Sequence, residues 1–218
     1  GSISLSGIEI DSTNESTLYN SLVLDNDKYN IVIMHGQIGQ INLNAMKNKG
    51  IDYLALGHVH EYQNGPIDNR GIYCYSGCLE GRGFDECGAK GFVVLDIDEQ
   101  KLTAGFSFIP FAYRNLYTIY VDVTGAMTTQ DAAAKIEDEL AKNPYSSRSL
   151  VKIVLVGEVD VDCEINTDFL KDMFEEYFYY EKVYDETKLL INYSDYEKDV
   201  SLKGEFIRMV LQSDMSEE

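Results

Sequence analysis

Three histidines, His35, His58 and His60, have the residue type and spacing best suited to chemistry, and the chain contains no other histidine. Neutral imidazole is a common ligand of manganese, iron and zinc. In an extended backbone, side chains two residues apart point to opposite faces, so His58 and His60 reach one ion only if the chain turns. Two ions about 3.5–4 Å apart allow each histidine to bind a different ion. For the His-x-His motif taken alone, the alternative is a pair of exposed loop histidines. The presence of His35 after the neighbouring strand favours a metal site instead.

Short apolar strands predicted at residues 29–34 and 51–56 position these histidines. His35 follows the first strand directly, and His58 follows the second after Gly57. Residues 40–50 between them have apolar side chains at roughly helical intervals and end in a lysine and a glycine, which is typical of a helix C-terminus. Ligands usually bind at the carboxyl ends of strands in such β-α-β units. We therefore expect the three histidines at one edge of a sheet.

The histidine motifs and the residues after them resemble a known family. MHG at residues 34–36, followed by GHVH at residues 57–60, is similar to the last two metal-binding motifs of calcineurin-like metallophosphoesterases. Ser76-Gly77, EGRGFDE at residues 80–86 and GAKGF at residues 88–92 resemble the segment that follows GHxH in SbcD, the nuclease subunit of the bacterial SbcCD DNA-repair complex. The resemblance covers roughly residues 25–215.

This resemblance implies an exonuclease and endonuclease that hydrolyses DNA phosphodiester bonds with two divalent ions, for which manganese is the expected metal. His35 and His58 would bind one ion, and His60 the other. Arg82 and Lys90 would contact a DNA phosphate, with a solvated or salt-bridged surface pair as the equally favoured alternative. The implied partners are DNA, an SbcC-like ATPase subunit and a second copy of the protein, joined through an amino-terminal region.

Three other motifs of the family have no counterpart in this chain. They are the opening Asp-x-His, the bridging Asp of a GD motif and the Asn-His of a GNHD motif, which normally precede the histidine strand. Without the bridging carboxylate and the acid/base histidine, the chain should bind two ions weakly and be inactive alone, with no catalytic residue of its own. We therefore expect it to be the C-terminal portion of a longer enzyme.

The rest of the chain predicts two domains. From Gly71 onward, strands are joined by turns, and a new α/β pattern starts just after residues 110–116. Its expected strands lie at residues 117–123, 150–157 and 189–193, and its helices at 128–143, from Thr167, and at 206–212. The predicted fold class is α/β: the C-terminal half of a metallophosphoesterase β-sandwich over residues 1–114, then a small α/β capping domain over residues 115–218.

Composition limits the class of protein. A chain of 218 residues with 44% hydrophobic content buries a sizeable core. The net charge of -19 counts against a whole-surface grip on nucleic acid, so any DNA contact must be local. No apolar run of about 18 residues, as a membrane-spanning helix needs, and no signal peptide is evident. Without a secretory signal, the four cysteines predict no disulfide framework. We expect a cytoplasmic protein without a membrane association.

Two weaker signals have structural explanations. The spacing of Cys74, Cys78 and Cys87 fits no familiar zinc knuckle, and buried thiols are favoured. Four of the sixteen tyrosines lie in residues 174–184, where they could stack on bases, but their helical spacing favours an ordinary core face.

Two other functions stay open. A calcineurin-like phosphoesterase acting on non-DNA phosphates shares MHG and GHVH, and the acidic charge favours it slightly. A non-catalytic module whose capping domain binds DNA or the ATPase partner would account for the missing motifs.

Overall fold

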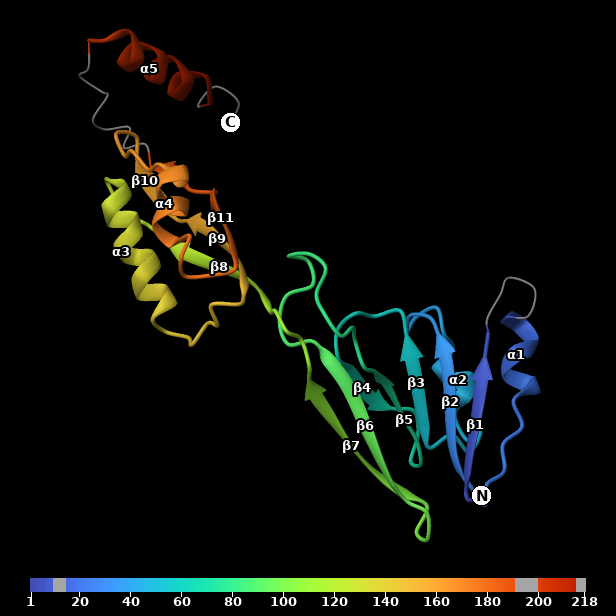
Figure 1. The fold of residues 1–218 in the computed structure, drawn as a ribbon. Helices are drawn as coiled ribbons and strands as arrows, with labels where there is room; N and C mark the ends of the chain where they lie inside the picture. The colour runs from blue at the N-terminus through green and yellow to red at the C-terminus, as the bar shows by residue number, and fades with distance from the viewer. Residues whose placement is uncertain (10–14, 191–199, 215–218) are drawn as a thin grey trace. The chain divides into compact units, whose positions relative to one another are not determined.

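The protein is mixed α/β and divides into two compact units. The structure, a computed structural model, describes residues 1–9, 15–190 and 200–214 (Figure 1). Unit 1 consists of residues 1–117 and 148–150, and unit 2 of residues 118–147 and 151–218. The chain first passes from one unit to the other close to the predicted boundary at residues 114 and 115, and it returns briefly to unit 1 at residues 148–150.

A five-stranded sheet forms the centre of unit 1. Its strands in spatial order are β1 (Ile3–Ile8), β2 (Tyr29–His35), β3 (Tyr53–Gly57), β5 (Ile72–Tyr75) and β4 (Gln63–Pro66). The first four run parallel, and β4 is antiparallel to β5. The predicted β-α-β unit is confirmed, because β2 and β3 are parallel neighbours connected through the short helix α2 (Leu43–Met46).

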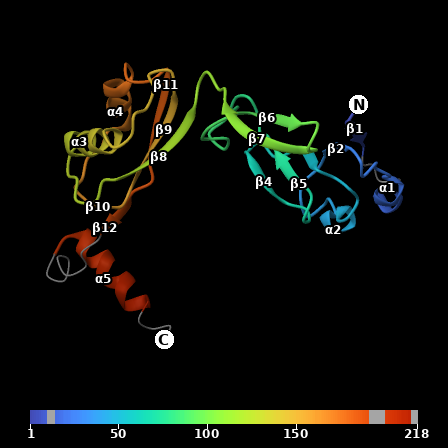
Figure 2. The ribbon, with the colours of Figure 1, turned by 90° about the horizontal axis from the view of Figure 1, so that it is seen from below.

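The two faces of this sheet carry different cores. On one face, buried Val32, Met34 and Leu54 pack with α2 and with α1 (Glu15–Ser21). On the other, Tyr29 and Tyr53 pack against the hairpin of β6 (Gly91–Asp98) and β7 (Thr103–Pro110). Figure 2 shows the hairpin and the two helices on opposite sides of the sheet. Because strand residues alternate between faces, the odd-numbered residues of β2, which include His35, belong to the hairpin's face.

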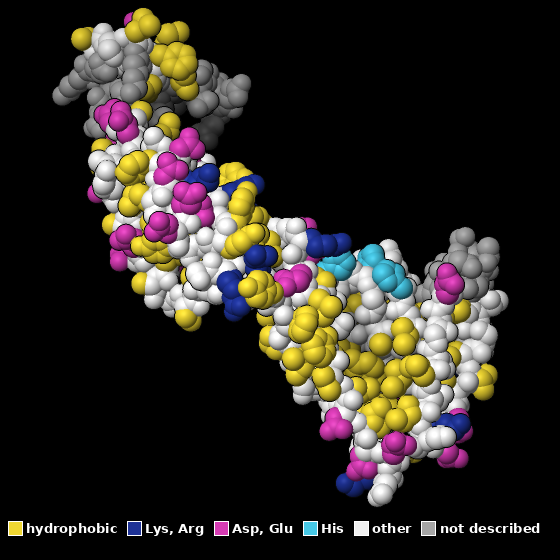
Figure 3. Space-filling model, in the orientation of Figure 1, with side chains coloured by type: hydrophobic (Ala, Val, Ile, Leu, Met, Phe, Trp, Pro, Cys, Tyr) yellow, Lys and Arg dark blue, Asp and Glu magenta, His cyan; other side chains and the backbone are white. Residues whose placement is uncertain are grey.

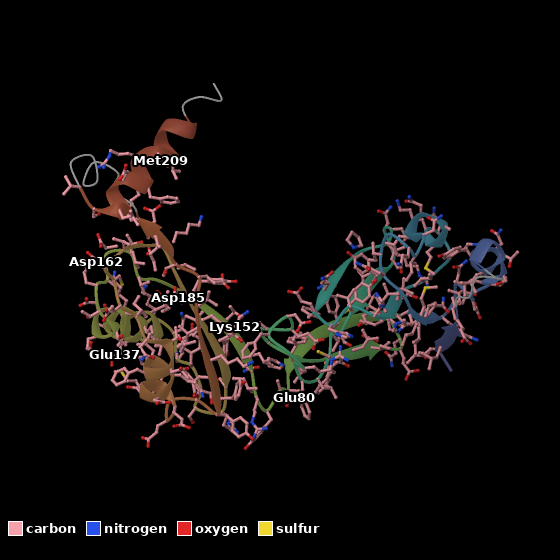
Figure 4. The ribbon with its side chains drawn as sticks, turned by 90° about the horizontal axis from the view of Figure 1, so that it is seen from above. Glu80, Glu137, Lys152, Asp162, Asp185 and Met209 are labelled. Carbon is pink, nitrogen blue, oxygen red and sulfur yellow. The ribbon has the colours of Figure 1, made fainter. Side chains whose placement is uncertain are left out.

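Unit 2 combines two small sheets with helices. Its elements are β8 (Leu116–Asp122), α3 (Thr129–Leu140), β9 (Leu150–Val156), β10 (Glu158–Asp160), α4 (Thr167–Phe174), β11 (Tyr180–Asp185), β12 (Lys188–Leu190) and α5 (Leu202–Asp214). One sheet has the order β11-β9-β8, and β10 pairs with β12. Figures 2 and 4 show α3, which carries the labelled Glu137, and α4 on the same side of the larger sheet. Ile136, Leu155, Leu170 and Phe174 are buried in its core.

The tyrosine-rich segment differs from its predicted form. Helix α4 ends at Phe174, and Tyr180–Asp185 is the strand β11. The exposed fractions of Tyr177, Tyr179, Tyr180 and Tyr184 are 51%, 61%, 41% and 44%. The prediction of a helical core face is therefore wrong for these four tyrosines. Tyr180 and Tyr184 lie in β11, whose pairing with β9 overrides the local helical spacing, and the other two lie between α4 and β11.

The other predicted elements of the second half are present at or near their expected positions. Strand β12 covers the start of the expected strand at residues 189–193, and residues 191–193 lie outside the described part of the chain. No helix among the described residues is long and apolar enough to cross a membrane.

Candidate metal centre

The carboxyl ends of β2 and β3 bring His35 and His58 together. His35 is in register with Gly57, and the amide of Gly36 donates a hydrogen bond to the Gly57 carbonyl at 3.2 Å. His58 follows immediately, and its ring lies edge-on to the His35 ring with 5.4 Å between the ring centroids. Figure 3 shows the histidine side chains, in cyan, gathered at one edge of unit 1. The predicted convergence at a sheet edge therefore holds for this pair.

Gly57 makes room for the His35 ring. A Cβ atom at this position would lie 2.8 Å from His35 Nδ1 and 3.6 Å from its Cε1. The first distance is well inside van der Waals contact, so any larger residue would displace the imidazole. The glycine of GHVH thus has a physical role in placing a histidine that is more than twenty residues earlier in the chain.

His58 has a backbone conformation that side chains rarely adopt. Its φ is 107°, whereas residues other than glycine are normally confined to negative φ. Such strain costs about 1–3 kcal/mol and is concentrated at functional sites. The extended backbone that would hold His58 and His60 on opposite faces is therefore interrupted at His58.

An open hollow of about 520 Å³ adjoins His35. It is lined by Gly7, Ile8, Glu9, Ile33, Met34, His35 and Gly57. Glu9 follows the carboxyl end of β1, as His35 ends β2, so it brings a carboxylate to the same sheet edge. The sequence reading missed Glu9 because it did not predict β1, although the alternating ISLSGI is a typical strand pattern.

His60 has a different set of partners. Its Nδ1 lies 2.7 Å from Glu86 Oε1, and the Arg82 guanidinium donates to the same oxygen at 2.8 Å. The Arg82 guanidinium, together with His60, lowers the pKa of Glu86 to about 2. Glu86 is only 11% exposed, so the carboxylate is enclosed by its two partners. The His60 imidazole is therefore held by an ionised carboxylate rather than lying free in a loop.

The loop that contains EGRGFDE also holds the backbone of His60. Lys90 Nζ donates to the His60 carbonyl at 3.0 Å, and the Cys78 thiol donates to the same oxygen at 3.5 Å. A Cβ atom on Gly77 would lie 3.1 Å from that oxygen, so the loop approaches closely. Glu80, labelled in Figure 4, accepts a 2.6 Å hydrogen bond from the amide of Tyr113 and ties the loop to the chain after β7.

The two residues predicted to contact DNA have unequal surroundings. Lys90 is 4% exposed, and its ammonium group is directed to the His60 carbonyl. The Arg82 side chain is 69% exposed and forms an ion pair with Glu86. A salt bridge of this kind is the alternative to a contact with a DNA phosphate. Of the two cations, Arg82 is the one with surface available for a phosphate.

The donor set fits part of a metal site. Two adjacent imidazoles, a third on the same loop and the neighbouring Glu9 carboxylate are ligands that manganese, iron and zinc accept. Within the described ranges, however, no three His, Cys, Asp or Glu side chains lie close enough together to hold an ion. Cys74, Cys78 and Cys87 form no disulfide and belong to no such group. Further ligands are needed to complete a centre at this edge.

Neither a scan against protein-family models nor a search of curated proteins finds a match to this sequence.

Proposed function

We propose that His35, His58 and His60 are the histidine part of a two-metal centre in an SbcD-type DNA nuclease. In this proposal, unit 1 is the C-terminal half of a metallophosphoesterase sandwich, unit 2 is its capping domain, and the remaining ligands come from a segment that carries the Asp-x-His, GD and GNHD motifs. The observation that supports it most directly is the strained, glycine-supported pairing of His35 with His58 at a sheet edge.

An uncovered apolar area next to the histidines supports the need for such a segment. On the face of the sheet that His35 shares, Leu5 is 66% exposed and Ile33 is 47% exposed. The β6–β7 hairpin packs against Tyr29, Tyr53 and Cys74 of the same face and leaves these two residues open. Apolar side chains on the face of a sheet are normally buried by a second layer, and here a covering layer would also bring side chains to the histidine edge.

The chain's own residues have defined parts in the proposed reaction. The imidazoles of His35 and His58 would hold one ion and that of His60 the other. When bound, two divalent ions neutralise charge on the scissile phosphate and lower the pKa of an attacking water. The exposed Arg82 guanidinium would bind a non-bridging phosphate oxygen. Lys90 would act through the backbone, by fixing the His60 carbonyl.

Cleavage of DNA by the gene product that carries this chain tests the proposal. With manganese, we expect wild-type protein to cut DNA and His58→Ala to lose roughly 100-fold or more of the rate, because one ion loses a ligand. Lys101→Ala, an exposed change after β6, is the matched control and should retain full activity. Unchanged cleavage by His58→Ala would overturn the proposal.

The choice of substrate separates this function from the phosphoesterase alternative, which the net charge of -19 favours. Parallel assays on DNA and on a small phosphomonoester such as p-nitrophenyl phosphate give the answer. Turnover of the monoester without any cleavage of DNA would replace the nuclease by a phosphoesterase that uses the same histidines.

A further inference from the structure

The ring of His60 has two neighbours that cannot both hydrogen-bond to the same nitrogen. Nδ1 lies 2.7 Å from Glu86 Oε1 and also 2.7 Å from Arg82 Nη2. A protonated Nδ1 donates to the carboxylate, whereas an unprotonated Nδ1 accepts from the guanidinium. These two arrangements are different tautomers. Nε2 is unprotonated in the first and carries the proton in the second. Only the first leaves a lone pair on Nε2 for a metal ion.

Glu86 is the fixed neighbour of the two. Its Oε2 accepts a 3.0 Å hydrogen bond from the backbone amide of Arg82, and its side chain is 11% exposed. The Arg82 side chain is 69% exposed, and its Nε atom also lies 3.3 Å and 3.4 Å from the two Glu86 oxygens. The guanidinium can therefore shift along the carboxylate without losing its ion pair. Glu86 has no comparable freedom to leave Nδ1.

We infer that Glu86 is a positioning residue that holds His60 as the Nδ1–H tautomer and presents Nε2 as its metal-binding atom. Metal-bound histidines commonly donate their second ring N–H to a carboxylate, which fixes the ring's tautomer and orientation. The metal role of Nε2 rests on the proposed function, whereas the Glu86–His60 contact does not. Lys90 and Cys78 complete the arrangement by holding the backbone of the same histidine.

Glu86 is not expected to bind the ion itself. Both of its oxygens already accept hydrogen bonds, Oε1 from the His60 ring and the Arg82 side chain and Oε2 from the Arg82 amide. Breaking these contacts would free Arg82 and release the His60 ring at the same time. The carboxylate therefore acts through His60.

Imidazole NMR of the whole chain tests this inference directly, because the chain has three histidines and so gives three ring spin systems. In ¹⁵N-histidine-labelled protein at about pH 8, above the ordinary imidazole range, His60 should show a protonated Nδ1 and an unprotonated Nε2. Single His→Gln variants assign the three rings. A His60 ring protonated at Nε2 would overturn the inference without the need for any variant at Glu86.

Two substitutions then distinguish the effects of Glu86 and Arg82 on the His60 tautomer. Glu86→Ala should remove the preference for Nδ1–H, while Arg82→Ala should keep it because the carboxylate remains. Asp85→Asn, at the exposed adjacent carboxyl group, is the control and should leave all three rings unchanged. Loss of the Nδ1–H form in Arg82→Ala but not in Glu86→Ala would assign the role to Arg82 and contradict the inference.

A zinc titration of the same samples adds the metal readout. We expect the His60 ring to shift with zinc through Nε2, and Glu86→Ala to need roughly 10- to 100-fold more zinc for the same shift. If the three rings ignore zinc also in the longer gene product that supplies the remaining ligands, while His60 keeps its Nδ1–H form, the proposed metal centre fails and the Glu86 contact stands. If all rings respond while His60 is protonated at Nε2 in the free protein, the inference about Glu86 fails and the metal centre stands.

Discussion

At the scale of single residues, the candidate centre depends on two neighbouring positions of GHVH. Gly57 is not a metal ligand but makes room for one, and His58 has a strained backbone. Gly57 has no side chain where a Cβ would meet His35 Nδ1, and His58 adopts a φ of 107°. The sequence predicted from residue type and strand ends that the histidines converge, and His35 and His58 do lie together. The role of Gly57 toward His35 depends on strand register, and the strain at His58 depends on a turn, so neither was visible in the spacing.

Gly57→Ala should impair the site through His35. The added Cβ lies 2.8 Å from Nδ1, so the ring must move away from the position beside His58. We expect the zinc concentration that shifts the His35 ring signal to rise by roughly 10- to 100-fold. Gly105→Ala on β7 is the control, because its Cβ meets nothing within 4 Å. Equal zinc responses of the two variants would show that Gly57 does not position His35.

His58→Gly and His58→Ala should differ in stability. Glycine adopts positive φ without a steric penalty, while alanine keeps the strain of the wild-type backbone. We expect His58→Gly to be the more stable variant by about 1 kcal/mol, the lower end of the cost of such a conformation. Urea unfolding of both variants measures the difference. A more stable alanine variant would mean that the positive φ at His58 is not strained.

At the scale of elements, periodicity predicted those segments in which one pattern dominates. The apolar runs that became β2, β3 and β9 and the amphipathic helix α3 were all recognised. Residues 174–184 were not, because closely spaced aromatic residues satisfy helical and strand patterns at once and long-range pairing with β9 decides between them. The helix expected at residues 128–143 begins where predicted, and a Thr and an Asp form a capping box at its start.

Thr128→Ala should weaken α3 by removing its N-cap. Thr128 Oγ1 accepts a 3.2 Å hydrogen bond from the Asp131 amide, which no other helical group can satisfy. Loss of such a cap costs about 1 kcal/mol. Urea unfolding should show this decrease in Thr128→Ala and a change of less than about 0.5 kcal/mol in Gln130→Ala, an exposed change in the same turn. A Thr128→Ala variant as stable as Gln130→Ala would mean that the cap contributes nothing.

The same capping box should make the protein sensitive to acid. Hydrogen bonds from the amide of Met127 and from the hydroxyl and amide of Thr128 lower the pKa of Asp131 below its ordinary 3.8. A carboxyl whose pKa is lower in the folded state stabilises the fold above its ordinary value and loses this contribution as the pH falls through the folded pKa.

Asp131→Asn removes the titrating group of this box. The stability advantage of wild type over Asp131→Asn should therefore be constant above about pH 5 and shrink below pH 3.8. Denaturant midpoints measured along this pH range provide the test, with Asp138→Asn, an exposed change on the same helix, as control. An advantage that grows on acidification would contradict the assignment.

At the scale of the whole molecule, each unit has its own buried apolar residues, and the candidate chemistry belongs to unit 1. All three histidines and the loop that holds His60 belong to unit 1, whereas Ile136, Leu155 and Phe174 are buried in unit 2. The composition of the sequence predicted a core of sufficient size, and the change of pattern after residues 110–116 predicted the division. The return of residues 148–150 to unit 1 was not predictable, because no local pattern marks a short excursion between units.

This division predicts that damage to one core leaves the other unit's site intact. Leu155 is fully buried on β9, so Leu155→Ala removes packing that unit 2 cannot replace and should lower its stability by roughly 2–5 kcal/mol. The ring signals of His35, His58 and His60, and their responses to zinc, should nevertheless match those of wild type under native conditions. Leu54→Ala, at an equally buried position beside the histidine strand, is the matched change in unit 1 and should shift those signals. If Leu155→Ala disturbed the histidine rings as strongly as Leu54→Ala, the geometry of the candidate centre would depend on unit 2, and the Glu86 and Gly57 contacts within unit 1 would be insufficient to define it.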